Sequence, residues 1–182
     1  MSHAAAVITC SDRASDGVYE DRSGPIAADA LTGAGFTVAD RVVVPDDAEQ
    51  IRLAIWTAVT QGARVVVTTG GTGVSPRDVT VDVTSELVDY EVPGLMEEVR
   101  RRGAEHTPMA LLSRGVAGVV SFEDARRAVV INAPGSTGGV RDTMAVVTPL
   151  LAHLVGQLDG GDHPAGTPTP VRDGRTEGVP QT

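Results

Sequence analysis

A glycine-rich segment followed by a carboxylate has the residue types that bind phosphate groups. Residues 65–73 read Val-Val-Val-Thr-Thr-Gly-Gly-Thr-Gly, so a β-branched run ends in glycines, and Asp78 follows shortly after them. Glycines let the backbone approach a ligand closely, and successive N–H groups in such a turn bind anions. A nearby carboxylate can hold Mg²⁺. The pattern predicts a site for a phosphate-containing ligand with a divalent metal.

The residues after the glycines bear on the same interpretation. Pro76 stiffens the loop, Arg77 provides a charged fork and Asp78 provides the metal ligand. The alternative is a tight strand–helix connection at Gly70–Gly73, with Asp78 as an ordinary residue of a helix start. The combination of glycines, arginine and aspartate favours ligand binding.

Three other polar clusters each follow an expected strand. They are Ser11-Asp12-Arg13, Asp46-Asp47 and Pro134-Gly135-Ser136. The first is either a surface loop or a ligand contact, because loops at strand ends often carry function. Aspartate at a helix start is usually a cap, so one of Asp46 and Asp47 can cap while the other faces the site.

The hydrophobic pattern predicts five strands and six helical segments that position these clusters. The expected strands are Ala4–Cys10, Phe36–Val44, Arg64–Thr69, Gly115–Phe122 and Arg127–Asn132. Expected helices run from Ser23 as cap to Gly33 or Gly35, from the turn Pro45-Asp46-Asp47 to Gly62, and over Val79–Val88, Pro93–Gly103, Pro108–Leu112 and Gly139–Val155. Alternating strands and helices imply an α/β fold with a mostly parallel sheet covered on both faces.

Ligands of such folds bind outside the carboxyl ends of the strands. Four expected strands end in a polar loop, and parallel strands bring those ends to one edge of the sheet. We therefore expect one shared site, and this convergence is a stronger signal than any single loop.

Composition limits the class of protein. With 182 residues, the chain fits one domain over residues 1–157 and a disordered, Gly/Pro-rich tail over 158–182. A net charge of −9 disfavours nucleic acid and anionic lipid as partners. The single cysteine fits a reducing compartment, and without a signal peptide or membrane span we expect a cytoplasmic protein.

Several other chemistries are disfavoured by the residues present. All fifteen cationic side chains are arginine, which excludes a Schiff-base or P-loop lysine. No histidine pair has zinc-ligand spacing, and no nucleophile elbow supports a Ser-His-Asp triad. Cys10 fits a small core residue, and Arg100–Arg102 fit a solvated helix end. Arg114 and Arg141 fit either surface charges or ligand contacts.

Eight ordered motifs resemble the MogA/MoaB family of molybdenum-cofactor biosynthesis, whose domain also occurs in gephyrin and plant Cnx proteins. These are Ser11-Asp12-Arg13-Ala14-Ser15, Gly17-Val18-Tyr19-Glu20-Asp21, Pro45-Asp46, Thr69-Gly70-Gly71-Thr72-Gly73, Pro76-Arg77-Asp78-Val79-Thr80, Pro93-Gly94, Leu112-Ser113-Arg114 and Pro134-Gly135-Ser136. The resemblance covers about Ala4–Val155, which is all of the chain except the tail.

The resemblance implies a three-layer α/β/α fold of the molybdopterin-binding type and a homotrimer. It also implies a molybdopterin adenylyltransferase, which transfers AMP from ATP to the terminal phosphate of molybdopterin with Mg²⁺ and hands the product to a molybdate-inserting, MoeA-like enzyme. By motif position, Asp46 and Asp78 are the catalytic and metal-binding residues. Substrate-binding positions are Ser11, Asp12, Arg13, Gly70, Gly71, Thr72, Gly73, Arg77, Thr80, Ser113, Arg114, Pro134, Gly135 and Ser136.

The chain departs from the family pattern in two places. Val81-Asp82 stands where many relatives carry Pro-Glu or Pro-Asp, and Asn132-Ala133 replaces the usual leucine before Pro-Gly. The sub-branch stays open between MogA and MoaB. The alternative function is a non-catalytic, MoaB-like molybdopterin-binding or carrier protein, and presence of both Asp46 and Asp78 favours the enzyme.

Overall fold

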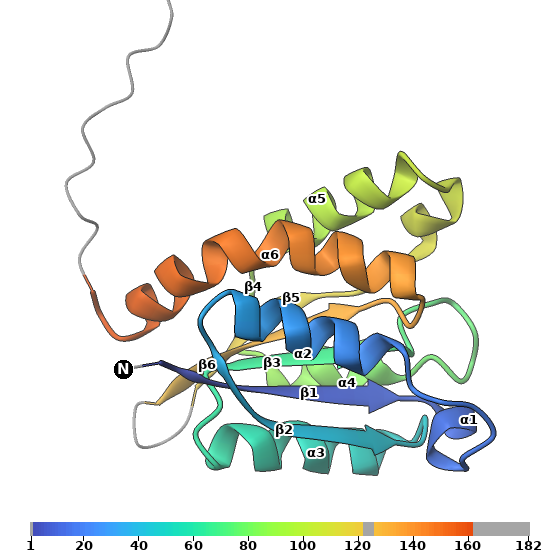
Figure 1. Ribbon diagram of the computed structural model, residues 1–182, viewed down its shortest axis with the longest axis horizontal. Coiled ribbons are helices and arrows are strands. Elements are labelled where there is room, and N and C mark those ends of the chain that lie inside the picture. Colours follow the sequence, from blue (N-terminus) through green and yellow to red (C-terminus); the bar gives the residue numbers. More distant parts are fainter. Residues whose placement is uncertain (1, 122–125, 162–182) are drawn as a thin grey trace, which may run out of the picture.

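A six-stranded sheet forms the centre of the computed structural model, which describes residues 2–121 and 126–161 (Figure 1). The strand order is β2-β1-β3-β6-β5-β4. The strands are β1 (Ala4–Cys10), β2 (Thr37–Val44), β3 (Val65–Thr69), β4 (Tyr90–Glu91), β5 (Ala117–Ser121) and β6 (Arg127–Ala133). Strands β2, β1, β3 and β6 are parallel, whereas β5 and β4 pair antiparallel. The expected, mostly parallel sheet is confirmed.

Helices cover both faces and complete three layers (Figure 1). One face carries α2 (Ser23–Gly33), α5 (Pro93–Ala104) and α6 (Thr137–Leu158), and the other carries α3 (Ala48–Thr60) and α4 (Thr80–Leu87). The short helix α1 (Asp12–Ser15) follows β1, and the 3-10 helix η1 (Pro108–Leu112) follows α5.

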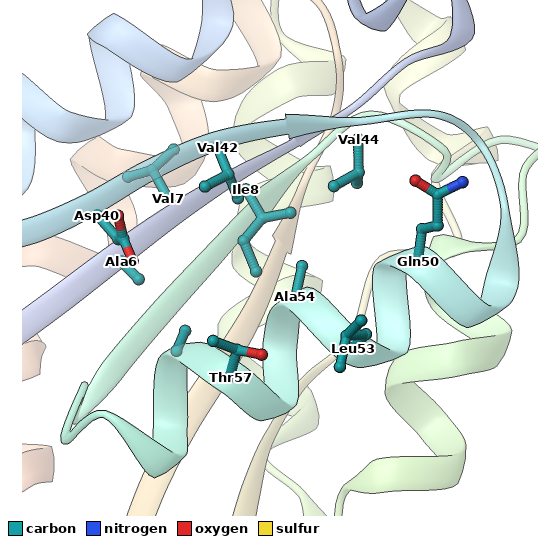
Figure 2. A pocket seen from close by; sticks show the side chains of 11 residues that line it. Ala6, Val7, Ile8, Asp40, Val42, Val44, Gln50, Leu53, Ala54 and Thr57 are labelled. Atoms are coloured by element: carbon teal, nitrogen blue, oxygen red, sulfur yellow. The ribbon is translucent and has the colours of Figure 1, made fainter.

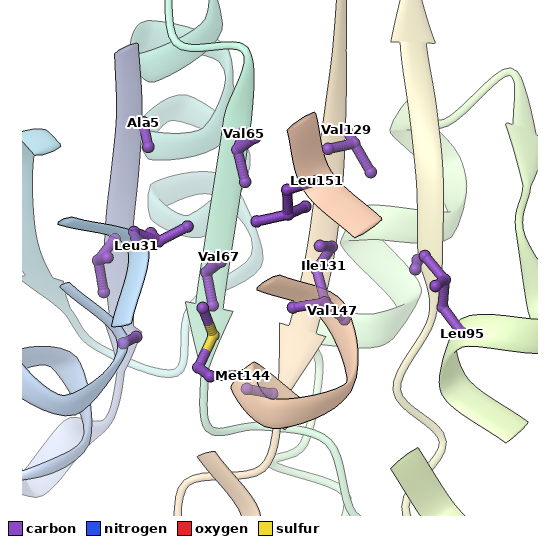
Figure 3. Packing of buried hydrophobic residues seen from close by; sticks show 14 of the residues in the cluster. Ala5, Leu31, Val65, Val67, Leu95, Val129, Ile131, Met144, Val147 and Leu151 are labelled. Atoms are coloured by element: carbon purple, nitrogen blue, oxygen red, sulfur yellow. The ribbon is translucent and has the colours of Figure 1, made fainter. Parts of the chain in front are cut away.

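Two aliphatic clusters on opposite faces of the sheet form the core. Alternation along β3 sends Val65 and Val67 to the α2/α6 side and Val66 to the α3 side. Figure 3 shows the first cluster, where Leu31 and Leu151 lie over the sheet. Each fully buried side chain of this size contributes about 1.5–3 kcal/mol. Both faces of the sheet are therefore covered by closely packed aliphatic side chains.

The outer strand β2 borders an apolar groove of about 220 Å³ against α3, where Val42 and Val44 lie across from Leu53 and Ala54 (Figure 2). The strand is largely exposed and carries Asp40 and Arg41 at its middle. Charges on an edge strand disfavour pairing with another chain.

Helix α2 begins differently from the expectation. Ser23 is its first residue rather than its cap, and Arg22 at the cap position makes no side-chain cap bond. Instead, Asp21 Oδ1 accepts hydrogen bonds from the amides of Ser23 (3.0 Å) and Gly24 (2.9 Å). A carboxylate just before the helix therefore satisfies its first N–H groups.

The C-terminal part of the chain extends the expected last helix to Leu158. The predicted tail covers residues 158–182; of these, Leu158 ends α6, and residues 162–182 lie outside the described residues. The end of the predicted strand at Phe122 and most of the predicted turn before Arg127 also lie outside them. Within residues 2–121 and 126–161, no helix combines the length and apolarity needed to cross a membrane.

Candidate functional site

Polar loops from four neighbouring parallel strands meet at the carboxyl edge of the sheet. The loops after β1 and β2 are joined by two reciprocal hydrogen bonds. The Asp12 amide donates to Asp46 Oδ2 (3.1 Å), and the Asp46 amide donates to Asp12 Oδ1 (3.0 Å). On the other side, the Gly70 amide donates to Ala133 O (3.0 Å), which joins the β3 and β6 loops. The expected convergence of strand ends is confirmed.

The two aspartates after β2, Asp46 and Asp47, have different structural roles. Asp47 caps α3, with its Oδ1 accepting from the Gln50 amide at 3.0 Å. Asp46 is held by the β1 loop and is only partly buried. The sequence left open which aspartate caps, and the structure assigns the cap to Asp47, so Asp46 is the one available to a ligand.

Arg77 bridges the β3 loop to the β1 loop. Its Nη2 lies 2.5 Å from Asp12 Oδ2, and its side chain is otherwise exposed. The hydrogen bond from Arg77 holds the pKa of Asp12 below its ordinary value. Asp12 therefore uses one oxygen on Arg77 and the other on the Asp46 amide.

Asp78 lies beside the glycine loop and within the electrostatic field of Asp46. Its Oδ2 accepts from the Ser75 amide (2.9 Å) and lies against Gly73, where a Cβ would come within 2.9 Å. Burial raises the pKa of Asp46, and the nearby carboxylates of Asp12 and Asp78 raise it further. The site thus concentrates negative charge, which a divalent cation would neutralise.

The glycine loop takes conformations that only glycine adopts without strain. Gly70 and Gly71 have φ of 95° and 63°. A Cβ on Gly70 would lie 2.3 Å from Cys10 O, and one on Gly71 would lie 2.1 Å from Thr80 Oγ1. Both residues must therefore be glycine for the loop to pass this close to β1 and α4.

The loop leaves its amides available for an anion. Within the described residues, the N–H groups of Gly71, Thr72, Gly73 and Val74 donate to no protein acceptor. At the adjacent start of α6, Ser136 accepts from the Gly139 amide (3.1 Å), whereas the amides of Thr137 and Gly138 donate to no acceptor among the described residues. A helix N-terminus beside a glycine turn is a favourable environment for phosphate.

We expect Gly70→Ala to destabilise the fold by about 2 kcal/mol or more, because it combines positive φ with a backbone clash. Gly156→Ala is the control, since this helical glycine has open space around it and gains about 0.5–1 kcal/mol. Urea unfolding of both variants measures the difference. If the two variants were equally stable, a side chain at position 70 would be tolerated, and the predicted clash with Cys10 O would be wrong.

Other predicted ligand contacts occupy supporting positions. Thr80 is fully buried beneath Gly71, and its hydroxyl makes no hydrogen bond of regular geometry although it adjoins the Cys10 thiol. Burial raises the pKa of Cys10 to about 12, so the thiol stays neutral, and its prediction as a core residue is confirmed. The Arg114 side chain bonds the loop backbone and Asp82.

The β1 loop is organised around Tyr19. Ser11 caps α1 by accepting from the Ala14 amide (3.3 Å), and its Oγ lies 3.2 Å from the Tyr19 hydroxyl. The Arg13 guanidinium stacks on the Tyr19 ring at 5.1 Å. Ser11 and Arg13 thus shape the loop, while Asp12 faces the other carboxylates.

Two cavities flank the Pro134–Ser136 loop and share Ser136. The larger is about 470 Å³ and mixes apolar side chains such as Met109 and Leu112 with Thr72, Gly73, Ser113 and Pro134. The smaller is about 410 Å³ and is lined by Tyr19, Glu20, Arg22, Ser23, Gly135, Ser136 and Thr137. Six of the predicted binding residues line these cavities: Thr72, Gly73, Ser113, Pro134, Gly135 and Ser136. Asp46 and Asp78 line neither of them.

Sequence reasoning missed two supports of the site. Asp21 Oδ2 accepts from Thr9 Oγ1 (2.8 Å), and Ser23 Oγ lies 2.9 Å from Thr69 Oγ1, so these groups tie the ends of β1 and β3 to α2.

The second support is Arg100, which donates to Ser113 O (3.3 Å) and Gly115 O (3.1 Å) and is therefore not simply solvated. Arg101, in contrast, pairs with exposed Glu98 and Glu105, as a solvated helix end does. An aspartate two residues before a helix is a signal that could have revealed the Asp21 cap.

These features define an α/β protein with a glycine loop and the carboxylates of Asp46 and Asp78 at the carboxyl edge of a parallel sheet. Residues 6–153 match the family described as "Probable molybdopterin binding domain", and the chain belongs to this family. The resemblance to MogA/MoaB proteins is thereby confirmed.

Similar proteins agree with this placement. The chain is 38% identical over 159 residues to a molybdenum cofactor biosynthesis bifunctional protein of Synechococcus elongatus, covering 87% of this chain and 48% of that protein. It thus spans about half the length of this relative. A molybdopterin adenylyltransferase of Pyrococcus furiosus is 35% identical, with 82% of this chain and 87% of that protein covered. A molybdopterin biosynthesis protein from Mycobacterium abscessus has a TM-score of 0.79 and 41% identity, covering 87% and 97% of the two chains.

Proposed function

We propose that this protein is a molybdopterin adenylyltransferase that acts in molybdenum cofactor biosynthesis. The observation that carries the proposal is the pair of aspartates, Asp46 and Asp78, beside a glycine loop with free amides. The adenylyltransferase from Pyrococcus furiosus, which matches most of the length of this chain, supports the same activity.

In this reaction, an oxygen of the terminal phosphate of molybdopterin attacks the α-phosphorus of ATP. A new O–P bond forms, the bond between the α-phosphorus and the bridging oxygen to the β-phosphate breaks, and pyrophosphate leaves. The nucleophile is already an anionic oxygen, so the protein needs no strong base. Its task is to align two polyanions and to stabilise charge at the α-phosphate. We assign this task to the amides of Gly71–Val74 and of Thr137 and Gly138 at the start of α6, which have no acceptor among the described residues.

The donor set fits Mg²⁺. Asp46 and Asp78 each engage only one carboxylate oxygen with a described protein donor, which leaves the other oxygen for a cation. Within the described residues, no group of three His, Cys, Asp or Glu side chains gathers as a complete metal site. Mg²⁺ needs only one or two carboxylates, because phosphate oxygens and water complete its shell. When bound, it would neutralise phosphate charge and assist departure of pyrophosphate.

The two cavities beside the Pro134–Ser136 loop share Ser136 and would give room for two substrates, the larger of them next to Thr72 and Gly73 of the glycine loop. Arg77 is exposed, and among the described residues its side chain pairs only with Asp12, so it can exchange this contact for a phosphate of the substrate. Both features support a reaction between two phosphate-bearing molecules.

The test is release of pyrophosphate from ATP and Mg²⁺ by the purified protein, with and without molybdopterin. We expect release that depends strictly on molybdopterin. Tight molybdopterin binding without release would instead identify the carrier function.

The resemblance also supports a homotrimer, a location in the cytoplasm, and hand-over of the adenylylated product to a MoeA-like, molybdate-inserting enzyme. The domain would comprise residues 1–157, followed by the tail. Light scattering of the purified chain measures the oligomeric state, for which we expect three copies.

A further inference from the structure

The Arg114 side chain bridges the two ends of the segment that joins the glycine loop to Asp78. Its Nε donates to Gly73 O at 2.7 Å, and its Nη2 donates to Asp78 O at 2.5 Å. These carbonyls stand at the two ends of residues 73–78. One planar guanidinium therefore sets the distance between the glycine turn and the aspartate.

Arg114 also fixes the direction of the loop amides. Its backbone N–H donates to Thr72 O at 2.8 Å, while its side chain holds Gly73 O. In a trans peptide, the C=O and the N–H of one unit point in opposite directions. Holding two successive carbonyls therefore turns the amides of Gly73 and Val74 away from Arg114, which is the orientation an anion-binding turn requires.

Asp82, in the first turn of α4, holds the guanidinium in place. Its Oδ1 lies 2.8 Å from Arg114 Nη1, and its Oδ2 lies 3.2 Å from Nη2. The hydrogen bond from Arg114 lowers the pKa of Asp82, so the carboxylate stays ionised at neutral pH. A two-pronged contact of this kind fixes orientation as well as distance.

We propose that Asp82 and Arg114 are positioning residues that form a clamp, which aims the Gly73 and Val74 amides and places Asp78, without contacting substrate. The proposal rests on the function proposed above and assigns Arg114 a different role from direct substrate binding. Nε and both Nη atoms of Arg114 are already engaged with protein acceptors.

The test compares turnover of Asp82→Asn and Arg114→Lys with the wild type. A lysine keeps the charge but cannot hold two carbonyls and a carboxylate together. We expect kcat to fall about 10-fold in Asp82→Asn and about 10²-fold in Arg114→Lys, because misplacement by about 1 Å has effects of this size. The KM for molybdopterin should change little in both variants.

A matched control is the exposed pair of Glu98 and Arg101 on α5, which has the same chemistry but lies on another helix. Glu98→Gln and Arg101→Lys should keep wild-type kcat. Circular dichroism and thermal unfolding establish that each variant is folded. Wild-type kcat in folded Arg114→Lys would overturn the clamp.

The charge-swapped double variant, Asp82→Arg with Arg114→Asp, separates positioning from simple ion pairing. It restores opposite charges but removes the guanidinium from the carbonyls of Gly73 and Asp78. We expect its thermal midpoint to be higher than those of the single variants Asp82→Arg and Arg114→Asp, while its kcat stays low. Recovery of kcat together with stability would contradict the positioning role.

Binding of inorganic pyrophosphate, measured by calorimetry, separates the clamp from the proposed function. If the wild type lacks turnover but binds pyrophosphate, the adenylyltransferase function fails, and the clamp still predicts weaker binding by Arg114→Lys. If the wild type turns over and both clamp variants match it in turnover and in binding, the clamp alone fails.

Discussion

Asp78→Asn should reduce molybdopterin-dependent pyrophosphate release by about 10³-fold or more, while molybdopterin binding largely survives. The asparagine Oδ1 can still accept the Ser75 amide, so the loop should keep its shape. The substitution removes one of the two carboxylates that would hold Mg²⁺. Loss of charge stabilisation by the metal raises the activation free energy by several kcal/mol. Steady-state assays across a range of Mg²⁺ concentrations give the size of the loss.

Asp47→Asn provides the control for this substitution. It removes the same charge from a neighbouring loop, and asparagine caps helices as well as aspartate does. We expect this variant to keep most of its turnover. Retained turnover in Asp78→Asn would refute the assigned role, whereas equal losses in both variants would point to net charge rather than to a specific ligand.

Asp46→Asn should have two opposite effects: turnover falls about as far as in Asp78→Asn, and the free energy of unfolding at pH 7 rises. Burial, together with the carboxylates of Asp12 and Asp78, raises the pKa of Asp46 in the folded state. Ionised Asp46 is therefore less favourable in the folded chain than in the unfolded chain. The asparagine removes this cost and can still accept the Asp12 amide.

The sign of this effect gives it a pH dependence. A raised pKa means that the folded state binds a proton more tightly, so the cost grows as pH rises through the ordinary value of 3.8 and is complete above the raised pKa. The stability difference between Asp46→Asn and the wild type should thus vanish in acid and be full at pH 7. Urea titrations at several pH values measure this difference. A wild type that is more stable than Asp46→Asn at pH 7 would contradict this account of the site.

The carboxyl edge of the sheet could be predicted because strand ends are local signals. Runs such as Val65–Thr69 are continuous and β-branched, and each parallel strand is followed by serine, proline or glycine. Because the strands pair in parallel, their carboxyl ends lie at the same edge of the sheet. The contact between Asp12 and Asp46 follows from this topology, although they stand far apart in the sequence.

Short elements without apolar periodicity could not be predicted. Strand β4 has only Tyr90 and Glu91, both exposed, and it forms because β5 offers an antiparallel neighbour. Helix α1 is four residues long and buries no side chain, so nothing in its sequence distinguishes it from a polar loop. Tertiary pairing and loop geometry decide both.

Individual roles within the site were also beyond the sequence. Contacts from an arginine to backbone carbonyls leave no residue pattern, so the position of Arg114 under the loop became visible only in three dimensions. Thr80 follows Asp78 closely in the chain, yet helix α4 turns it beneath Gly71. Spacing alone cannot separate a side chain that faces a ligand from one that supports the loop.

A crystal structure of the wild-type protein with Mg²⁺ and a non-hydrolysable ATP analogue tests the central claim most directly. We expect the triphosphate to lie against the amides of Gly71–Val74, with the cation between it and the carboxylates of Asp46 and Asp78. A nucleotide bound elsewhere on the molecule, with this edge of the sheet empty, would contradict the account.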